Sequence, residues 1–340
     1  MRQMAITGLC IVALAAGSGD RAAADAVADF YKGKTLTVIV GYSAGGGYDL
    51  YARALSRHMG KHLPGNPNFI VQNLTGAGSL NAANHLYNVS PKDGTYFGTF
   101  GRGLAMEPLI GTARVKFDPT KFTWLGSGTN EISVCATWHT SPVKTWQDAL
   151  KMQFAVGGEG AGSDPDTYAA FVRNVFGVKL KLVTGYHGTS DIILAIERGE
   201  VDGRCGWSWS SIKSTRAAWI KDKKLNYLVH MSDTKAPELQ HVPLVSDFAN
   251  ARQKQVLKLV TSRQTVGRPF AAPPGVPADR KQALRNAFMA ALKDPAFLAE
   301  AKKLRLDVNP VSGTDVENLI RELYSSPKDV VEEARKAIKP

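Results

Sequence analysis

Residues 35–47 of the chain read Thr35-Leu36-Thr37-Val38-Ile39-Val40-Gly41-Tyr42-Ser43-Ala44-Gly45-Gly46-Gly47. The first six form a short, continuous, β-branched run, which is typical of a strand buried on both faces of a parallel sheet. A glycine-rich turn follows, and Leu50, Ala54 and Leu55 then recur at helical spacing through about residue 62. A strand, a glycine turn and a helix in this order predict the first unit of an α/β fold.

The same order repeats further along the chain. A strand at 69–71, a turn at Gly76-Ala77-Gly78-Ser79, a helix at 80–87 and a strand at 95–100 predict a parallel sheet with right-handed crossovers. A second set begins near Ile132, with expected strands at 132–136, 154–156, 180–183, 201–205 and 227–229. Helices are expected between these strands near 167–176, 191–198 and 211–220, and near the C-terminus at 281–292, 296–304, 314–323 and 329–338. The proline-rich segment 268–275 is expected to break the regular secondary structure there.

The N-terminus has the pattern of an export signal. Met1-Arg2 precedes an apolar stretch at 6–16, and Ala22-Ala23-Ala24 fits an A-x-A cleavage site. The apolar stretch is shorter than the roughly 20 residues that span a bilayer. We therefore expect a cleaved signal peptide at 1–24 and an exported, soluble product. Cys135 and Cys205 remain in that product, and the sequence leaves open whether they pair.

Charge and motif content exclude several classes of protein. The 340 residues hold 42 Lys plus Arg and 30 Asp plus Glu, a net charge of +12, but the basic residues are scattered and form no nucleic-acid module. Three cysteines without a CxxC pair argue against a structural zinc site, and His58 and His62 lack the glutamate of the H-E-x-x-H pattern. The G-x-G at Gly45 and Gly47 has Leu50 where a dinucleotide fingerprint needs glycine. No metal or cofactor is therefore expected.

Ser43 lies in a G-x-S-x-G pattern, which suggests an exported serine hydrolase as the alternative function. In that fold the nucleophile follows a strand and precedes a helix, as here. The oxyanion-hole loop, however, comes from an earlier strand–helix connection, and only one strand precedes Ser43. A glycine turn without catalytic chemistry is the favoured interpretation, and no catalytic residue is assigned.

Four small-residue turns predict an anion-binding cleft. Two, at 41–47 and 76–79, belong to the first set of strands, and two, at 157–163 and 186–189, belong to the second. Each opens a helix after a strand, and the free N–H groups and positive dipole end of a helix attract anions. Ligands of open α/β sheets bind at the carboxyl ends of the strands. Tyr48, Trp207 and Trp209 suggest an apolar or aromatic acid, although core positions are the favoured interpretation. Tyr48 is the best ligand contact of the three, because it lies inside one of the turns.

An ordered set of motifs resembles the solute-binding proteins of tripartite tricarboxylate transporters, the TctC or Bug family. Residues 37–53 resemble the family's first strand, glycine loop and Asp-x-x-Ala-Arg helix, and 73–79 resemble its N-x-P-G-A-G-G turn. Residues 91–95, 185–189 and 199–202 are similar to P-x-D-G-[YT], P-Y-[KR]-G-[ST] and G-G-x-V-D. Residues 237–243 and 272–277 are similar to P-x-x-P-x-V-P-T and A-P-x-G-T-P. Thr75, Ser79, Gly185 and Leu244 depart from these patterns.

The resemblance implies a type II periplasmic-binding-protein fold, in which two α/β lobes close by a hinge on a small organic carboxylate. It implies lobe 1 at 25–128 plus about 245–340 and lobe 2 at 129–244. It also implies a monomer that is not an enzyme and that delivers its ligand to membrane permease subunits. Asp49 is expected to cap its helix, Arg53 to form an ion pair within its lobe, and Asp202 either to contact a ligand hydroxyl or to cap a turn. The expected ligand-binding residues are Ser43, Ala44, Gly45, Gly46, Gly47, Tyr48, Asp49, Gly76, Ala77, Gly78, Ser79, Thr129, Ser163, His187, Gly188, Thr189 and Asp202.

Overall fold

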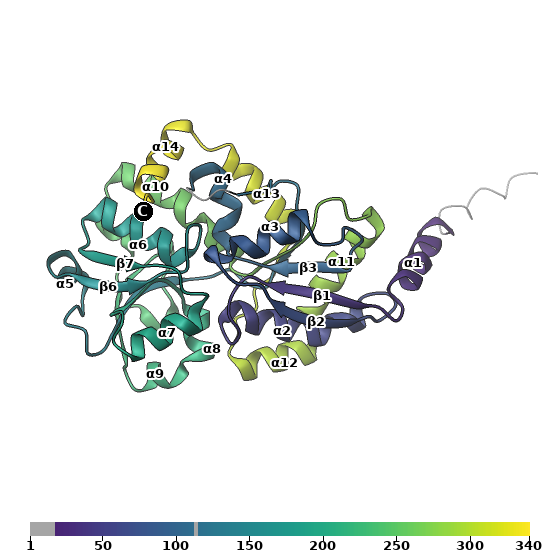
Figure 1. Cartoon of the computed structure of the whole chain (residues 1–340), viewed down its shortest axis with the longest axis horizontal. Coiled ribbons are helices and arrows are strands. Elements are labelled where there is room, and N and C mark those ends of the chain that lie inside the picture. Colours follow the sequence, from purple (N-terminus) through teal and green to yellow (C-terminus); the bar gives the residue numbers. More distant parts are fainter. Residues whose placement is uncertain (1–17, 112–114) are drawn as a thin grey trace, which may run out of the picture.

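A computed structural model describes residues 18–111 and 115–340 of the chain. Most of the predicted signal peptide, 1–24, lies outside these residues, so its cleavage stays a prediction. Helix α1, Ser18–Tyr31, projects from one end of the molecule (Figure 1). None of the helices in the described ranges is long and apolar enough to cross a membrane.

The first lobe is built on a six-stranded sheet in the order β11-β4-β10-β3-β1-β2. β1 pairs in parallel with β2 and β3, while β10 runs antiparallel between β3 and β4. Five of the six residues of β1 are buried, as its uninterrupted apolar run predicts. The strands are β1 (Thr35–Val40), β2 (Asn68–Asn73), β3 (Tyr96–Thr99), β4 (Thr123–Ser127), β10 (Pro269–Ala272) and β11 (Val311–Ser312).

Helices cover both faces of this sheet because alternate side chains of β1 point to opposite sides. Leu36, Val38 and Val40 pack with α1, α2, α11 and α12, whereas Ile39 packs with α3 and α13. The helices are α2 (Gly47–Met59), α3 (Leu80–Asn88), α11 (Ala278–Ala291), α12 (Pro295–Leu304) and α13 (Gly313–Tyr324). The short helix α4 (Glu107–Ile110) instead places Ile110 in the core of the second lobe.

The second lobe is built on a five-stranded sheet in the order β7-β6-β8-β5-β9. β5 runs antiparallel between β8 and β9, in the position that β10 takes in the first sheet. The strands are β5 (Ser133–Trp138), β6 (Phe154–Gly157), β7 (Leu180–Val183), β8 (Gly203–Ser208) and β9 (Leu225–His230). The helices that follow them are α5 (Trp146–Lys151), α6 (Asp164–Phe176), α7 (Thr189–Glu197), α8 (Trp209–Thr215) and α9 (Ala217–Lys221).

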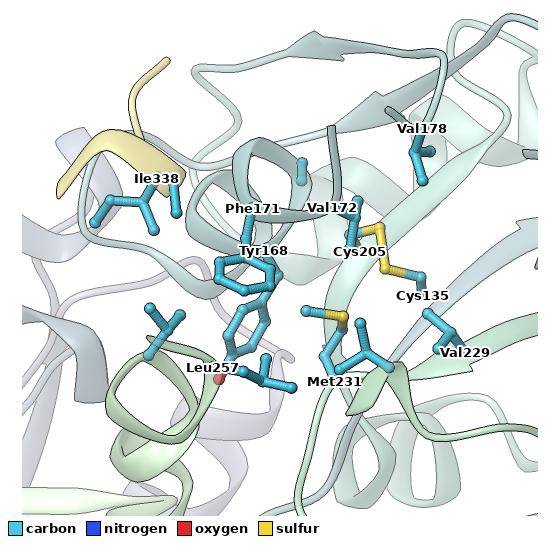
Figure 2. Packing of buried hydrophobic residues seen from close by; sticks show 14 of the residues in the cluster. Cys135, Tyr168, Phe171, Val172, Val178, Cys205, Val229, Met231, Leu257 and Ile338 are labelled. Atoms are coloured by element: carbon cyan, nitrogen blue, oxygen red, sulfur yellow. A yellow bond between two sulfur atoms is a disulfide. The ribbon is translucent and has the colours of Figure 1, made fainter. Parts of the chain in front are cut away.

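Two late helices, α10 (Ala251–Thr261) and α14 (Lys328–Ala337), also pack against the second lobe. Leu257 and Ile338 lie in the same buried cluster as Phe171 and the Cys135–Cys205 disulfide (Figure 2). The disulfide joins neighbouring strands β5 and β8 and answers the pairing question that the sequence left open. The other face of this sheet buries Trp207 and Trp209, so their interpretation as core residues is confirmed.

The predicted α/β fold of two lobes is confirmed, and the two sheets lie side by side (Figure 1). Strands β4, β10 and β11 and helices α4, α5 and α10 were not predicted. β10 falls inside the proline-rich segment, where regular structure was expected to break off. The helix predicted at 211–220 is broken at Arg216, whose backbone is not helical (φ −138°, ψ 38°). The boundaries proposed for the two lobes stay a prediction.

Two crossing segments connect the sheets and form the hinge expected of such a fold. The segments 128–132 and 262–268 run alongside each other, with Gly267 N donating to Thr129 O (2.8 Å) and Glu131 N to Gln264 O (2.8 Å). The two hinge segments are therefore hydrogen-bonded to each other where the chain passes between the lobes.

Candidate functional site

A cavity lies between the lobes where several helices begin. Its volume is about 20 Å³, which is room for about one water molecule. Helices α2, α6 and α7 each present their first residues to it, so three positive dipole ends converge on the cavity. Its wall consists of Tyr42, Gly46, Gly47, Tyr48, Arg102, Glu159, Asp164, Pro165, Thr189, Arg204, Gly206, Ser208 and Ser211.

The first lobe supplies an aromatic part of this wall. The rings of Tyr42 and Tyr48 pack 4.7 Å apart, and the Tyr48 hydroxyl accepts a hydrogen bond from Arg102 N (3.2 Å). Burial raises the pKa of both phenols, so both stay neutral at physiological pH. Gly47 is required beside them, because a Cβ there would lie 2.1 Å from Ser211 Oγ of α8.

Arg102 is a buried cation that joins the two lobes. It begins the 3₁₀ turn Arg102–Met106 after β3, and its guanidinium donates to the carboxylate of Asp164 at the start of α6. It also donates to Ser133 Oγ (2.9 Å). Burial acts to lower the pKa of Arg102, but the charges of Asp164, Tyr48 and Glu131 together outweigh burial, and the pKa is raised.

Arg204 is a second buried cation, contributed by strand β8. It forms an ion pair with Glu159 (2.8 Å) and donates to the hydroxyl of Thr189 (3.0 Å) at the start of α7. Burial raises the pKa of the Glu159 carboxyl, although the charge of Arg204 opposes the rise. The second lobe thus presents a cation whose position is held by a carboxylate and a hydroxyl.

A third arginine, Arg268, lies behind the cavity at the hinge. It is fully buried, pairs with Glu131 (2.9 Å), and donates to Ser210 Oγ (2.9 Å) and Ser211 Oγ (3.0 Å). Its guanidinium lies 4.7 Å from the centre of the Tyr48 ring, a cation–π contact that fixes the aromatic wall to the hinge.

Each of these three arginines has one N–H group that forms no hydrogen bond to the side chains around it. The Nε–H groups of Arg102, Arg204 and Arg268 are buried and have no hydrogen-bond partner among the described residues. An unpaired buried donor costs about 1–3 kcal/mol. Since Arg102 and Arg204 line the cavity, these donors can gain an acceptor from a molecule bound there.

Direct hydrogen bonds join the two lobes at their glycine turns. Ser43 N donates to His187 O (3.2 Å), and Gly78 N donates to Glu159 O (2.7 Å). The glycine turns are pressed together, because a Cβ on Gly78 would lie 2.9 Å from Gly160 O of the second lobe. A solute of several non-hydrogen atoms can therefore enter only when the lobes separate and these hydrogen bonds break.

The structure places the predicted site residues in four groups. Gly46, Gly47, Tyr48 and Thr189 line the cavity. The contact between the lobes is made by Ser43, Ala44, Ala77, Gly78, His187 and Gly188. Residues that shape the adjoining turns and helix starts are Gly45, Asp49, Gly76, Ser79 and Ser163. Thr129 lies in the hinge, and Asp202 lies directly before β8 of the second sheet.

Three of these side chains have roles that the structure defines. Asp49 accepts from Gly45 N (2.9 Å) and pairs with Arg53 (2.9 Å), which confirms the predicted ion pair of Arg53. Asp49 therefore ties the glycine loop to α2. Ser163 caps α6, where its hydroxyl accepts from Asp166 N. Asp202 accepts from Ala155 N (2.7 Å), which ties it to β6.

Sequence reasoning missed the charged residues that dominate the site. Arg102, Glu159, Asp164, Arg204 and Arg268 all lie near strand ends or helix starts. Glu159 falls inside the predicted turn at 157–163, but it was not singled out there, and no motif marks the other four. The sequence held one signal for Arg204. It lies inside the predicted strand at 201–205, and an arginine in a buried strand needs a partner for its charge. The partners come from distant segments, so the sequence alone could not pair them.

The two-lobed α/β fold is also that of solved periplasmic binding proteins. Solved structures with this fold include the periplasmic binding protein BugD, with a TM-score of 0.72 and 19% identity over 90% of this chain and 98% of that one. A protein from R. palustris with adipate matches with a TM-score of 0.69 and 17% identity over 88% and 97% of the two chains. MatC from Rhodopseudomonas palustris with bound malate matches with a TM-score of 0.68 and 19% identity, over 90% of this chain and 99% of that one.

These likenesses show the fold, which agrees with the resemblance found in the sequence motifs. A scan against protein-family models gives no match, and a search of curated proteins likewise gives none.

Proposed function

We propose that the chain is a periplasmic solute-binding protein of the Bug type that captures a small organic carboxylate between its lobes. The observation that carries this proposal is the pair Arg102 and Arg204, one from each lobe, with unpaired Nε–H groups at the same cavity. A carboxylate between them would accept a hydrogen bond from both lobes at once and so favour closure. The start of α2 at Gly46 and Gly47 adds a positive dipole end.

The fold neighbours support the same class of ligand. Structures of this fold have been solved with adipate and with malate, both of which are carboxylates. Delivery of the solute to membrane permease subunits, action as a monomer and a periplasmic location after removal of residues 1–24 complete the proposal. The other predicted site residues, from Ser43 to Asp202, remain proposed as loop and turn contacts of the ligand.

Binding can be tested by thermal unfolding of the mature protein with a panel of mono- and dicarboxylates. A ligand that binds only the folded state raises Tm, by an amount equivalent to about 2.7 kcal/mol at a hundred times its Kd. The double variant Arg204→Gln/Glu159→Gln removes the guanidinium donors of Arg204. It also neutralises Glu159, so no buried carboxylate is left without its partner. We expect it to weaken the tightest ligand by about tenfold or more. Arg198→Gln, which changes an exposed arginine of the same lobe, is the matched control and should bind normally.

A folded sample that responds to no carboxylate would rule the proposal out. Unchanged affinity in the double variant would show that Arg204 takes no part.

The alternative function, a serine hydrolase that uses Ser43, lacks a general base in this geometry. Within the described ranges, Ser43 Oγ has no hydrogen-bond partner, whereas a serine nucleophile needs a base within about 3 Å. Labelling with a fluorophosphonate checks this alternative directly. Covalent attachment at Ser43, abolished by Ser43→Ala, would favour the hydrolase over the binding protein.

A further inference from the structure

The charged side chains that line the cavity cancel one another. Arg102 and Arg204 contribute two positive charges, and Asp164 and Glu159 contribute two negative ones, in two ion pairs. Each ion pair is almost completely shielded from solvent. The lining therefore brings no net charge to a bound ligand, although it offers strong individual donors and acceptors.

The helix ends add only a small positive potential. Each helix start is equivalent to roughly half a positive charge. All three helices that begin at the cavity also have an aspartate in the first turn, Asp49 in α2, Asp164 in α6 and Asp191 in α7. Asp164 and Asp49 are already paired with Arg102 and Arg53, so of these three only Asp191 is left to offset the dipoles. About half a positive charge remains, which suits one carboxylate rather than two.

A second carboxylate on the ligand would be buried without compensation. Desolvating an ion costs several kcal/mol unless an opposite charge repays it, and both cavity arginines are already paired with acids. The carboxylates of Asp164 and Glu159 are, conversely, acceptors that a hydroxyl or ammonium group of the ligand can satisfy.

From this balance, and resting on the proposed function, we infer that the ligand is a small acid with a single carboxylate and a hydroxyl or ammonium donor. Its carboxylate takes the unused Nε–H groups of Arg102 and Arg204. Its donor faces Asp164 or Glu159. Di- and tricarboxylates are disfavoured by the lining itself.

A matched set of four-carbon acids tests this inference by calorimetric titration of the mature protein. The set comprises butyrate, 3-hydroxybutyrate, 2-aminobutyrate, succinate and malate. We expect 3-hydroxybutyrate or 2-aminobutyrate to bind at least about tenfold tighter than succinate or malate, because a buried unpaired charge costs more than one hydrogen bond gains. Butyrate, which has no donor, should be weaker than its substituted analogues.

A charge variant tests the cause of the preference. Glu159→Gln gives the lining a net positive charge, so the affinity for malate relative to 3-hydroxybutyrate should rise by about tenfold. Circular dichroism shows whether Glu159→Gln folds. If it does not, Asp164→Asn, which removes the negative charge of the other ion pair, replaces it in the same measurement. Glu200→Gln, an exposed acid of the same lobe, should leave the ratio unchanged.

The outcomes separate this inference from the proposed function. Tighter binding of succinate or malate than of every monocarboxylate overturns the inference and leaves carboxylate capture intact. An unchanged ratio in both charge variants also overturns it. Absence of binding by every acid in the set, with folded protein, counts against both.

Discussion

The guanidinium of Arg102 donates to the carboxylate of Asp164, and this buried ion pair joins the first lobe to the second. Arg263 approaches the same carboxylate at 3.6 Å, so three separate segments meet at Asp164. A buried charge that loses its partner destabilises a protein more than the pair stabilises it. The closed arrangement of the lobes should therefore depend on both members being present.

A double-mutant cycle measures this dependence. Arg102→Met and Asp164→Asn should each lower the free energy of unfolding by about 3 kcal/mol or more, and the double variant by clearly less than the sum. Urea unfolding followed by tryptophan fluorescence gives the values. The exposed pair Arg198 and Glu200, 3.8 Å apart, is the control cycle and should show coupling below about 0.5 kcal/mol. Additive losses at Arg102 and Asp164 would contradict the linkage.

Gly78 should be needed for closure rather than for folding. Its φ of +61° and its contact with Gly160 of the second lobe leave no room for a Cβ. Gly78→Ala should hold the lobes apart, raise the radius of gyration in small-angle X-ray scattering and weaken ligand binding. Gly177→Ala, at φ +72° with open space around it, is the matched control and should cost only about 1 kcal/mol of backbone strain. Equal scattering from both variants would argue against steric control of closure.

The Cys135–Cys205 disulfide should contribute strongly to stability. It is buried and closes a loop with a sequence separation of 70 residues. Loop-closure entropy for that length corresponds to about 4 kcal/mol. The variant Cys135→Ala/Cys205→Ala should unfold at a lower urea concentration, and its midpoint should no longer respond to dithiothreitol. A wild-type midpoint that is itself insensitive to full reduction would speak against this role.

His230 should make stability fall in mildly acidic solution. It is fully buried in β9, its Nε2 accepts from Ala236 N (3.2 Å), and its Nδ1 lies 3.4 Å from Pro243 O. Burial lowers the pKa of the imidazole below its usual 6.5, although hydrogen bonds to backbone carbonyls oppose this. The folded state thus binds the proton less readily than the unfolded state. The stabilisation is complete above about pH 6.5 and is lost as the pH falls through the folded-state pKa.

The matched variants for this effect are His230→Gln and His241→Gln. Gln at 230 keeps a donor and an acceptor but does not titrate, so the free energy of unfolding should vary less between pH 7 and 5. His241 is exposed and is the smallest of the influences that lower the pKa of His230, so its replacement should change the wild-type pH profile far less. The prediction fails if the His230→Gln profile parallels that of the wild type.

The sequence predicted the scaffold better than it predicted the charged cavity. β1 and β7 have the bounds that their apolar runs predict, because local burial is encoded in consecutive residues. β10 was missed because Pro269 begins it within a segment dense in turn residues, and only pairing with β3 and β4 makes it a strand. The partners of Arg102 and Arg204 lie 62 and 45 residues away along the chain, a separation that no spacing rule reaches.

The packing of α10 and α14 affects the order in which the molecule can fold. The core of the second lobe combines residues from Met106 to Ile338, so this lobe remains incomplete until the last helix is available. Contacts this distant in sequence slow folding. A chain exported as proposed would gain from this delay, because it would stay unfolded long enough to pass through a translocation channel. Packing of the C-terminal helix α14 would then be the step that completes folding of the exported chain.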